Sequence, residues 1–394
     1  MVRAKLSKLF LEFFSSEQAS GIILILCTFA SILLANSPFG TGYLEFWHTK
    51  VGFETGNIFL KYSIEHWIND ALMAIFFLLI GLEVERELYI GELSDLKNAS
   101  LPIFAAVGGM VVPALLYLLF NQGTDTLNGF GIPTATDIAF ALGVIALVGS
   151  RVPVSLKVFI TAFAIIDDLG AIFVIALFYV GDFSFYYLML SLSIFGLLLV
   201  FNRMRIHHLA FYLIPGVFMW YFMLQSGVHA TLAGVLLAFA IPFGDGSERS
   251  PSYGLQHMLH KPVAFGIMPI FAFANTGITF NPNWVGNLWN TNSLGIFAGL
   301  FLGKPLGISL ASFLAIKTRL SNLPGDLTWK HIVGAGFLGG IGFTMSIFIT
   351  LLAFENAEII QSTKIAILLS SLVAGTVGFL ILSRGNTNGS SETE

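Results

Sequence analysis

The feature that most constrains this fold is a series of long apolar segments that occupies almost the whole chain. Of its 394 residues, 56% are hydrophobic and only 11% are charged, whereas a soluble domain averages about 25% charged residues. Hydropathy predicts about twelve membrane-spanning helices, at roughly 18–36, 63–84, 100–120, 126–148, 154–180, 185–202, 207–223, 227–242, 256–276, 293–316, 330–354 and 362–383. We therefore expect an all-α polytopic membrane protein with one transmembrane domain over residues 1–384.

The lysines and arginines are distributed unevenly between the predicted loops. When alternate loops are assigned to the cytoplasm, beginning with the N-terminus, the 19 Lys and Arg residues fall mostly inside. The exceptions are Lys50, Lys61 and Lys364, which fall outside, and Lys304, which falls within a span. This bias predicts an even number of spans with both termini in the cytoplasm. The net charge of −4, without a basic patch, gives no indication of a nucleic-acid partner.

Two segments outside the spans carry a structural signal of their own. The first outer loop places Thr55-Gly56-Asn57 between alternating apolar residues, which favours a hairpin at about 43–62. The polar residues 385–394 predict a disordered cytoplasmic tail. The basic N-terminus and the apolar run GIILILCTFASILLA are expected to remain as the first helix, because many spans follow and the basic residues orient it.

Two predicted spans contain residues that disfavour a continuous helix. The fourth includes GFGIPTATDIAFALG, and the eleventh includes GAGFLGGIGFTMS. Proline and clustered glycine break helices, and irregular backbone at membrane depth is tolerated only within protein or along a cavity. Each such span is the middle of a trio, at about 100–180 and 293–383, and the trios have opposite orientations. Two inverted three-helix repeats with broken fourth and eleventh helices are typical of a secondary transporter.

Four charged residues fall at mid-depth in these trios: Asp137, Asp167, Asp168 and Lys304. An ionised carboxylate inside a membrane is costly, so these residues indicate a site for a cation or a proton. Adjacent helical residues point about 100° apart. One of Asp167 and Asp168 can therefore face Asp137, while the other faces Lys304. The alternative is that the charges are only structural pairs, although neutral polar pairs would serve packing more cheaply.

The available ligands at mid-depth are oxygens. Thr136, Asp137, Asp168 and the carbonyl groups freed near Pro133 offer the shell that small hard cations prefer. Carboxylates also bind protons, so the same groups can hold either a proton or a cation. Mutually exclusive occupancy of this kind is what an ion exchanger requires.

Six motifs in order resemble the NhaA-type sodium/proton antiporters: PTATDIAFALG, AIIDDLGA, SGVHATLAGV, FAFAN, GKPLGI and GIGFTMSIF. The resemblance implies an electrogenic antiporter of a bacterial inner membrane that exports Na⁺ or Li⁺ against protons and is activated at alkaline pH. It further implies a homodimer formed through the outer-loop hairpin, and no cofactor besides the transported ions. Asp168 and Asp167 match the cation- and proton-binding carboxylates, with Asp167 paired to Lys304. Asp137 and Thr136 match residues at the helix break.

The resemblance also suggests residues for the pH response. Glu83 and Glu87 lie four residues apart at the cytoplasmic end of the second span, and His257 begins the ninth. His229 is associated with the pH profile in the family, although a hydrogen-bonded interfacial histidine is the simpler interpretation. The chain departs from familiar relatives at Glu85, where they carry lysine, and at Gln256, where they often carry glutamate.

Two other function classes fit part of the pattern. An intramembrane aspartyl protease would use Asp137 with Asp167 or Asp168, but would leave Lys304 and the second broken helix unexplained. A proton-coupled symporter of organic solutes would want a larger polar pocket with Arg, Gln or Asn, which the mid-depth residues lack. We therefore expect a secondary active transporter and not an enzyme.

Overall fold

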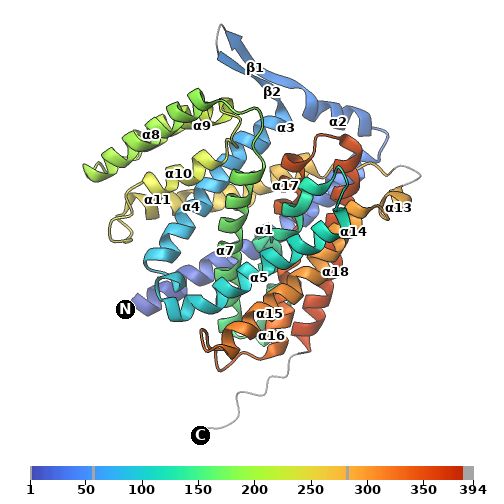
Figure 1. Ribbon diagram of the computed structural model, residues 1–394. Helices are drawn as coiled ribbons and strands as arrows, with labels where there is room; N and C mark the ends of the chain where they lie inside the picture. The colour runs from blue at the N-terminus through green and yellow to red at the C-terminus, as the bar shows by residue number, and fades with distance from the viewer. Residues whose placement is uncertain (1, 56–57, 281–283, 385–394) are drawn as a thin grey trace. The chain divides into compact units, whose positions relative to one another are not determined.

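The computed structural model describes residues 2–55, 58–280 and 284–384. Apart from one two-stranded hairpin, the regular elements among them are helices (Figure 1). They form two compact units. Unit 1 comprises Met1–Ile22, Glu92–Ala171 and Asn281–Glu394, and unit 2 comprises Ile23–Gly91 and Ile172–Phe280. The long helices α1 (Val2–Ala35) and α7 (Val154–Phe178) contribute residues to both units.

Unit 1 contains the residues of the two predicted trios except 172–180, which belong to unit 2. Besides parts of α1 and α7, its elements are η2 (Glu92–Ser94), α5 (Leu96–Asn121), η3 (Leu127–Thr134), α6 (Ile138–Val148), η4 (Gly149–Arg151), α13 (Trp284–Asn287), α14 (Thr291–Phe297), η6 (Ala298–Gly303), α15 (Lys304–Lys317), α16 (Trp329–Gly339), α17 (Phe343–Ala353) and α18 (Ala357–Ser383). Here η3 is a 3₁₀ helix and η6 is a π-helix. Helices α5 and α15 pack against each other, as do α16 and α18 (Figure 1).

The contact between α5 and α15 is close because glycines face each other. A Cβ atom added to Gly307 would lie 2.1 Å from the carbonyl oxygen of Gly108, and one added to Gly108 would lie 2.2 Å from that of Gly307. Small residues of this kind let the backbones of membrane helices approach each other. The contact lies one turn beyond Lys304, so it helps to place that lysine within unit 1.

Unit 2 contains the hairpin and a second helical bundle. Its remaining elements are α2 (Gly40–His48), β1 (Lys50–Thr55), β2 (Ile58–Ser63), α3 (Ile64–Trp67), η1 (Ile68–Leu72), α4 (Met73–Tyr89), α8 (Phe185–Arg203), α9 (Ala210–Gln225), α10 (Leu232–Ala240), α11 (Pro251–Pro262), η5 (Val263–Ile267) and α12 (Met268–Asn275). Both η1 and η5 are π-helices. The core of this bundle is apolar and includes Leu82, Tyr212 and Met219, which are fully buried.

The hairpin is shorter than the sequence suggested. Its strands are antiparallel, with Val51 opposite Tyr62 and Phe53 opposite Leu60, while the preceding residues form α2 instead of strand. The expected turn residues Gly56 and Asn57 lie outside the described residues, as does the expected tail at 385–394. Two side chains from other elements of unit 2 bind the strands: Trp67 Nε1 donates to the Val51 carbonyl, and Gln225 Nε2 donates to the Phe59 carbonyl.

The helices confirm an all-α, multi-pass membrane architecture in coarse outline. Among the described residues, seven helices are long and apolar enough to cross a membrane, or up to nine if two bent pairs each count as one span. The number is below the expected twelve partly because some predicted spans consist of short pieces. For example, α10 has nine residues and α9 has 16.

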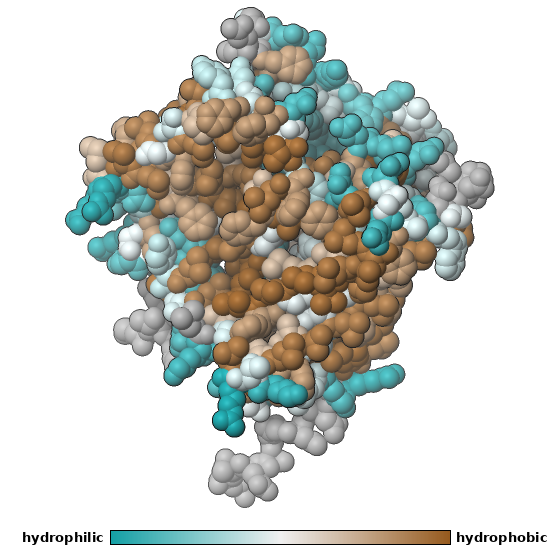
Figure 2. All heavy atoms as spheres, in the orientation of Figure 1, coloured by the Kyte–Doolittle hydropathy of each residue, from teal (hydrophilic) through white to brown (hydrophobic). Residues whose placement is uncertain are grey.

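Apolar side chains also cover much of the outer surface. On the face drawn in Figure 2, hydrophobic residues dominate a broad area. On α5, Val107, Val111, Leu115 and Leu119 are all exposed at a spacing of four residues. A soluble monomer rarely exposes contiguous apolar patches of this kind, so these helix faces are suited to an apolar environment.

Candidate functional site

The fourth predicted span is interrupted at Ala135–Asp137. Helix η3 ends at Thr134 and α6 begins at Ile138, with Ala135 and Asp137 in extended conformation. Pro133, which lacks an amide hydrogen, lies at the end of η3. Asp137 caps α6, because its Oδ1 accepts a hydrogen bond of 3.1 Å from the Phe140 amide.

The eleventh predicted span is interrupted at Gly340–Gly342. Helix α16 ends at Gly339, α17 begins at Phe343, and their axes differ by 44°. The Asp137 carboxylate reaches this second break: its Oδ2 accepts from the amide of Thr344 at 3.1 Å and from the Thr344 hydroxyl. One buried carboxylate thus caps the N-termini of both α6 and α17, where its negative charge offsets the positive ends of two helix dipoles.

Further hydrogen bonds hold the two breaks together. The amide of Asp137 donates to the Ile341 carbonyl at 2.7 Å, and the Thr136 hydroxyl donates to the Gly339 carbonyl at 2.8 Å. The Ser346 hydroxyl donates to the Ile132 carbonyl at 2.7 Å. Carbonyl and amide groups released by each interruption therefore find partners at the other, which meets the requirement for irregular backbone in an apolar interior.

Lys304 and Asp167 form a buried salt bridge beside these two breaks. Lys304 Nζ lies 2.7 Å from Asp167 Oδ2, and both side chains are 0% exposed. The same ammonium donates to the Thr136 hydroxyl at 2.9 Å, and it lies 5.5 Å from the centre of the Phe163 ring. A buried ion pair is tolerated when further hydrogen bonds compensate the loss of water, and Thr136 supplies one of them.

Asp168 follows Asp167 on α7 and is 4% exposed. Helix geometry turns adjacent side chains about 100° apart, so Asp168 projects from a different face of α7 than the carboxylate paired with Lys304. The structure thus brings Asp167, Lys304, Thr136 and Asp137 into one chain of contacts through the two breaks. The Asp167 carboxylate and the Thr136 hydroxyl, which contacts the Lys304 ammonium and the Gly339 carbonyl, place oxygen atoms of the kind that small hard cations prefer at this site.

The pH-response candidates at the end of α4 lie in unit 2. Glu83 Oε1 lies 4.0 Å from His260 Nδ1, whereas the predicted His257 is exposed and stacks on Tyr253 at 6.4 Å between ring centres. Glu87 pairs with Arg86 at 3.1 Å. His260 stands beside His257 as a titratable candidate in the sequence, but its pairing with Glu83 depends on the packing of α4 against α11 and could not be predicted.

The unusual residue Glu85 is also buried in this region. Its side chain is 5% exposed and its Oε2 accepts a hydrogen bond of 3.1 Å from the hydroxyl of Ser252. Ser252 lies in the first turn of α11, where the positive end of the helix dipole favours a nearby acidic group. A glutamate at this position is therefore accommodated by a hydroxyl donor and a helix N-terminus.

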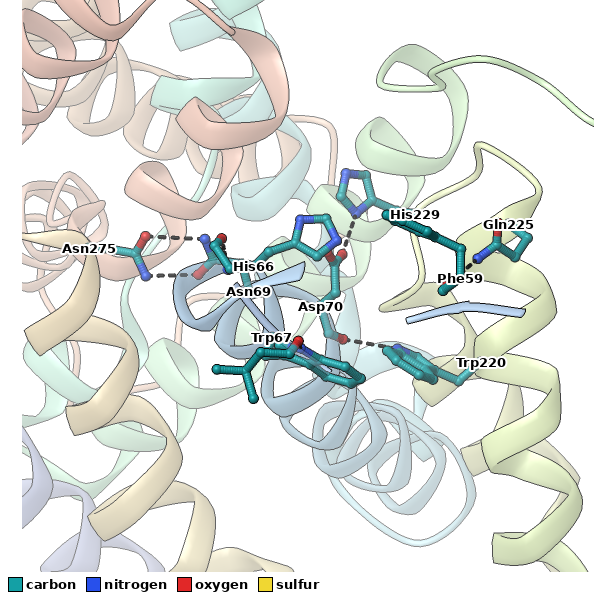
Figure 3. A network of polar contacts seen from close by, with 11 residues as sticks. Phe59, His66, Trp67, Asn69, Asp70, Trp220, Gln225, His229 and Asn275 are labelled. Carbon is teal, nitrogen blue, oxygen red and sulfur yellow. Dashed lines mark hydrogen bonds and ion pairs between the residues drawn. The ribbon is translucent and has the colours of Figure 1, made fainter. Parts of the chain in front are cut away.

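His229 belongs to a polar network near the start of α4 (Figure 3). Asp70 lies between two imidazoles, with His66 Nε2 2.9 Å from Asp70 Oδ2 and His229 Nδ1 3.9 Å from Asp70 Oδ1. Beside it, Asn69 and Asn275 exchange a reciprocal pair of amide hydrogen bonds at 3.2 and 2.8 Å. The sequence analysis missed His66, although its spacing of four residues from Asp70 on a helix was a usable signal.

Comparison with known proteins identifies the family of the chain. The profile of the Na⁺/H⁺ antiporter 1 family matches residues 11–382. The chain is 61% identical over 385 residues to a protein of Dechloromonas aromatica, covering 97% of each chain, and 58% identical over 378 residues to one of Flavobacterium psychrophilum, covering 96% of each. A protein of Bordetella bronchiseptica is 48% identical, with 94% of this chain and 95% of the relative covered. All three relatives are named Na⁺/H⁺ antiporter NhaA. The chain therefore belongs to the Na⁺/H⁺ antiporter 1 family.

Proposed function

We propose that this protein is an electrogenic antiporter that exports Na⁺ or Li⁺ from the cytoplasm in exchange for protons by alternating access. The observation that carries the proposal is the fully buried Lys304–Asp167 salt bridge, which contacts Thr136 at the crossing of two interrupted helices. A membrane protein has no structural need for such charges at this depth. The free-energy cost of burying these charges is explained if they bind the transported ions.

The chemistry follows from competition for the same oxygens. A dehydrated Na⁺ takes ligands from Asp168, Asp167 and the Thr136 hydroxyl. Because Asp167 and Thr136 are also the partners of the Lys304 ammonium, Na⁺ entry weakens the hold on Lys304 and favours loss of its proton. Asp168 must also be ionised to bind Na⁺. More than one proton therefore leaves for each Na⁺ bound, and the exchange moves net charge.

The proposed architecture has twelve spans within one transmembrane domain, with inverted trios at about 100–180 and 293–383. The interrupted helices lie at the middle of each trio, which is where transporters of this design place their ion sites. The charge bias of the loops supports a multi-pass protein of the bacterial inner membrane with both termini in the cytoplasm. Lipid would contact the exposed apolar rows on helices such as α5.

Activation at alkaline pH is assigned to groups outside the ion site. Glu83, Glu87 and His257 are the candidates at the cytoplasmic end of α4 and on α11, and His229 is the candidate beside Asp70. The contacts of Glu83 with His260 and of His229 with Asp70 support this assignment, because protonation of a histidine changes the charge facing a carboxylate.

The hairpin β1–β2 is the proposed contact of a homodimer. All six residues of β1 are exposed, and Val51, Phe53 and Phe59 present apolar side chains on the pair of strands. An exposed strand edge is a ready template for pairing with another chain, and a second copy offers the same edge.

The relatives are named antiporters, which are transporters and not enzymes. A protease that uses Asp137 is also disfavoured by the structure, because both carboxylate oxygens of Asp137 accept hydrogen bonds from the starts of α6 and α17. Those bonds give the carboxylate a structural role at the helix breaks.

The direct test measures dequenching of a pH-sensitive dye in everted membrane vesicles after addition of Na⁺, Li⁺ or K⁺. We expect rapid dequenching with Na⁺ and Li⁺ and little with K⁺. Cleavage of a transmembrane peptide by the protein in detergent would instead support the protease. Equal responses to all three cations, or none to any, would contradict the proposal.

A further inference from the structure

A buried polar cluster in unit 1 lies at the opposite end of η3 from the ion site. Tyr117, which is 0% exposed, places its hydroxyl oxygen 2.6 Å from the Thr126 carbonyl and 2.7 Å from Asn292 Oδ1. Asn292 Nδ2 donates to the Thr363 hydroxyl at 2.6 Å. Asn121 Nδ2 donates to the Thr291 carbonyl at 3.2 Å, and its Oδ1 accepts from the Thr126 hydroxyl at 2.7 Å. We call these six residues, Tyr117, Asn121, Thr126, Thr291, Asn292 and Thr363, the Tyr117 cluster.

Two segments begin at this cluster and end at the ion site. Thr126 directly precedes η3, which runs through eight residues to Thr134 and leads to Thr136. Asn292 is in the first turn of α14, which continues through η6 to Lys304. At their far ends the two segments meet again, because Lys304 Nζ donates to the Thr136 hydroxyl at 2.9 Å.

The segments also pack along their length. A Cβ atom added to Gly299 of η6 would lie 2.6 Å from Pro133 Cβ of η3. Helix η3 also lies against α5, because a Cβ atom added to Gly129 would lie 2.3 Å from the Tyr117 hydroxyl. Neither η3 nor η6 is an α-helix, and both 3₁₀ and π-helices have weaker hydrogen-bond geometry than an α-helix. The relative register of these two segments is therefore set by the contacts at their ends together with the packing of Gly299 against Pro133.

We infer that Tyr117 and Asn292 are positioning residues for the ion site. By joining the start of η3 to the start of α14, they set the register of the two segments and hence the separation of Thr136 from Lys304. Na⁺ must share Thr136 with the Lys304 ammonium, so a change in this separation alters Na⁺ affinity without touching a ligand. The inference rests on the proposed Na⁺/H⁺ exchange.

The test compares two variants within the cluster. Tyr117→Phe keeps the ring over Gly129 but removes the hydroxyl that contacts both segments, while Asn121 still bonds to Thr126 and Thr291. Thr363→Val removes the partner of Asn292 on α18 and leaves the Tyr117–Asn292 contact in place. Because loss of one hydrogen bond between neutral groups is worth about 1 kcal/mol, we expect Tyr117→Phe to raise the KM for Na⁺ about fivefold in proteoliposomes. Thr363→Val is expected to lower the melting temperature while its KM stays within about twofold of wild type.

The outcomes separate this inference from the proposed function. If the wild-type protein shows no Na⁺-driven exchange, the proposed function fails. If the wild type exchanges Na⁺ and Tyr117→Phe keeps the wild-type KM while losing thermal stability, the cluster is only structural and the inference is overturned. Equal increases of KM in both variants would also overturn it, because a general loss of stability in unit 1 would then explain the change in Na⁺ affinity. The melting temperature of each variant, followed by fluorescence at increasing Na⁺ concentration, compares their Na⁺ affinities without transport.

Discussion

Lys304 and Asp167 lie 2.7 Å apart in the interior of unit 1, and neither side chain has any exposed surface. The lysine begins α15 and the aspartate lies in the middle of α7, so the ion pair joins helices from the two predicted repeats. Thr136 completes the contact from the interrupted fourth span.

Asp168→Asn should abolish exchange and leave a folded protein in the membrane. The neutral amide keeps the size of the side chain but removes the charge that binds Na⁺ and the proton. The measurement is Na⁺-driven dequenching in everted vesicles, with protein amount and melting temperature determined in parallel. Asp182→Asn, at an exposed position, is the matched control and should exchange normally. Dequenching near the wild-type level in Asp168→Asn would remove this residue from the ion site.

Lys304→Ala should lower both stability and exchange. Removing one partner of a buried ion pair leaves an uncompensated charge, which costs about 3–5 kcal/mol. Neutralising the other partner as well, in Lys304→Ala with Asp167→Asn, should recover part of the lost stability. A double-mutant cycle on the melting temperature and free energy of unfolding in detergent checks the coupling. Additive effects of the two substitutions would show that the pair does not contribute as a unit.

Competition between ions should appear in the pH dependence of transport. If Na⁺ and protons share the carboxylates, acidification below the pKa of the site should raise the KM for Na⁺ by about tenfold per pH unit for one shared proton, and more steeply for a coupled pair. The maximal rate should change much less while the protein remains active. The measurement is proteoliposome exchange against Na⁺ concentration at several pH values, with equal pH on both sides.

A separate pH sensor at Glu83, Glu87 and His257 predicts the opposite kinetic pattern. Protonation there would reduce the number of active transporters, so the maximal rate would fall with little change in KM. A KM that stays constant with pH, together with a collapsing maximal rate, would rule out simple competition. It would place the pH response at the end of α4.

Gly307→Ala should disrupt the packing of α5 against α15. The added methyl group would lie 2.1 Å from the Gly108 carbonyl oxygen, so the two backbones must separate, and overpacking of this kind typically costs about 1–3 kcal/mol. The measurement is the melting temperature in detergent. Gly143→Ala on α6 is the control, since an added Cβ there meets no atom within 4 Å. An unchanged melting temperature in Gly307→Ala would contradict the close approach of the two helices.

Local sequence determined the elements of this protein and the positions of its interruptions. Long apolar runs produce helices because every buried backbone group must find a partner within its own segment. The breaks near Pro133 and at Gly340–Gly342 follow from the chemistry of proline and glycine at those positions. The unusual charges Asp137, Asp167, Asp168 and Lys304 could be recognised in the sequence because they lie within apolar runs.

Tertiary structure decided which of these groups meet. Residue order alone left open which of Asp167 and Asp168 faces Lys304, because the rotation of α7 about its axis depends on its neighbours. Packing likewise placed His260, and not His257, beside Glu83, brought His66 and His229 to Asp70, and joined Tyr117 to Asn292. Hydropathy reports how apolar each segment is. It carries no information on how a helix is rotated about its axis, or on the register between segments that are distant in the chain. Those are set by side-chain contacts that form only when the helices pack.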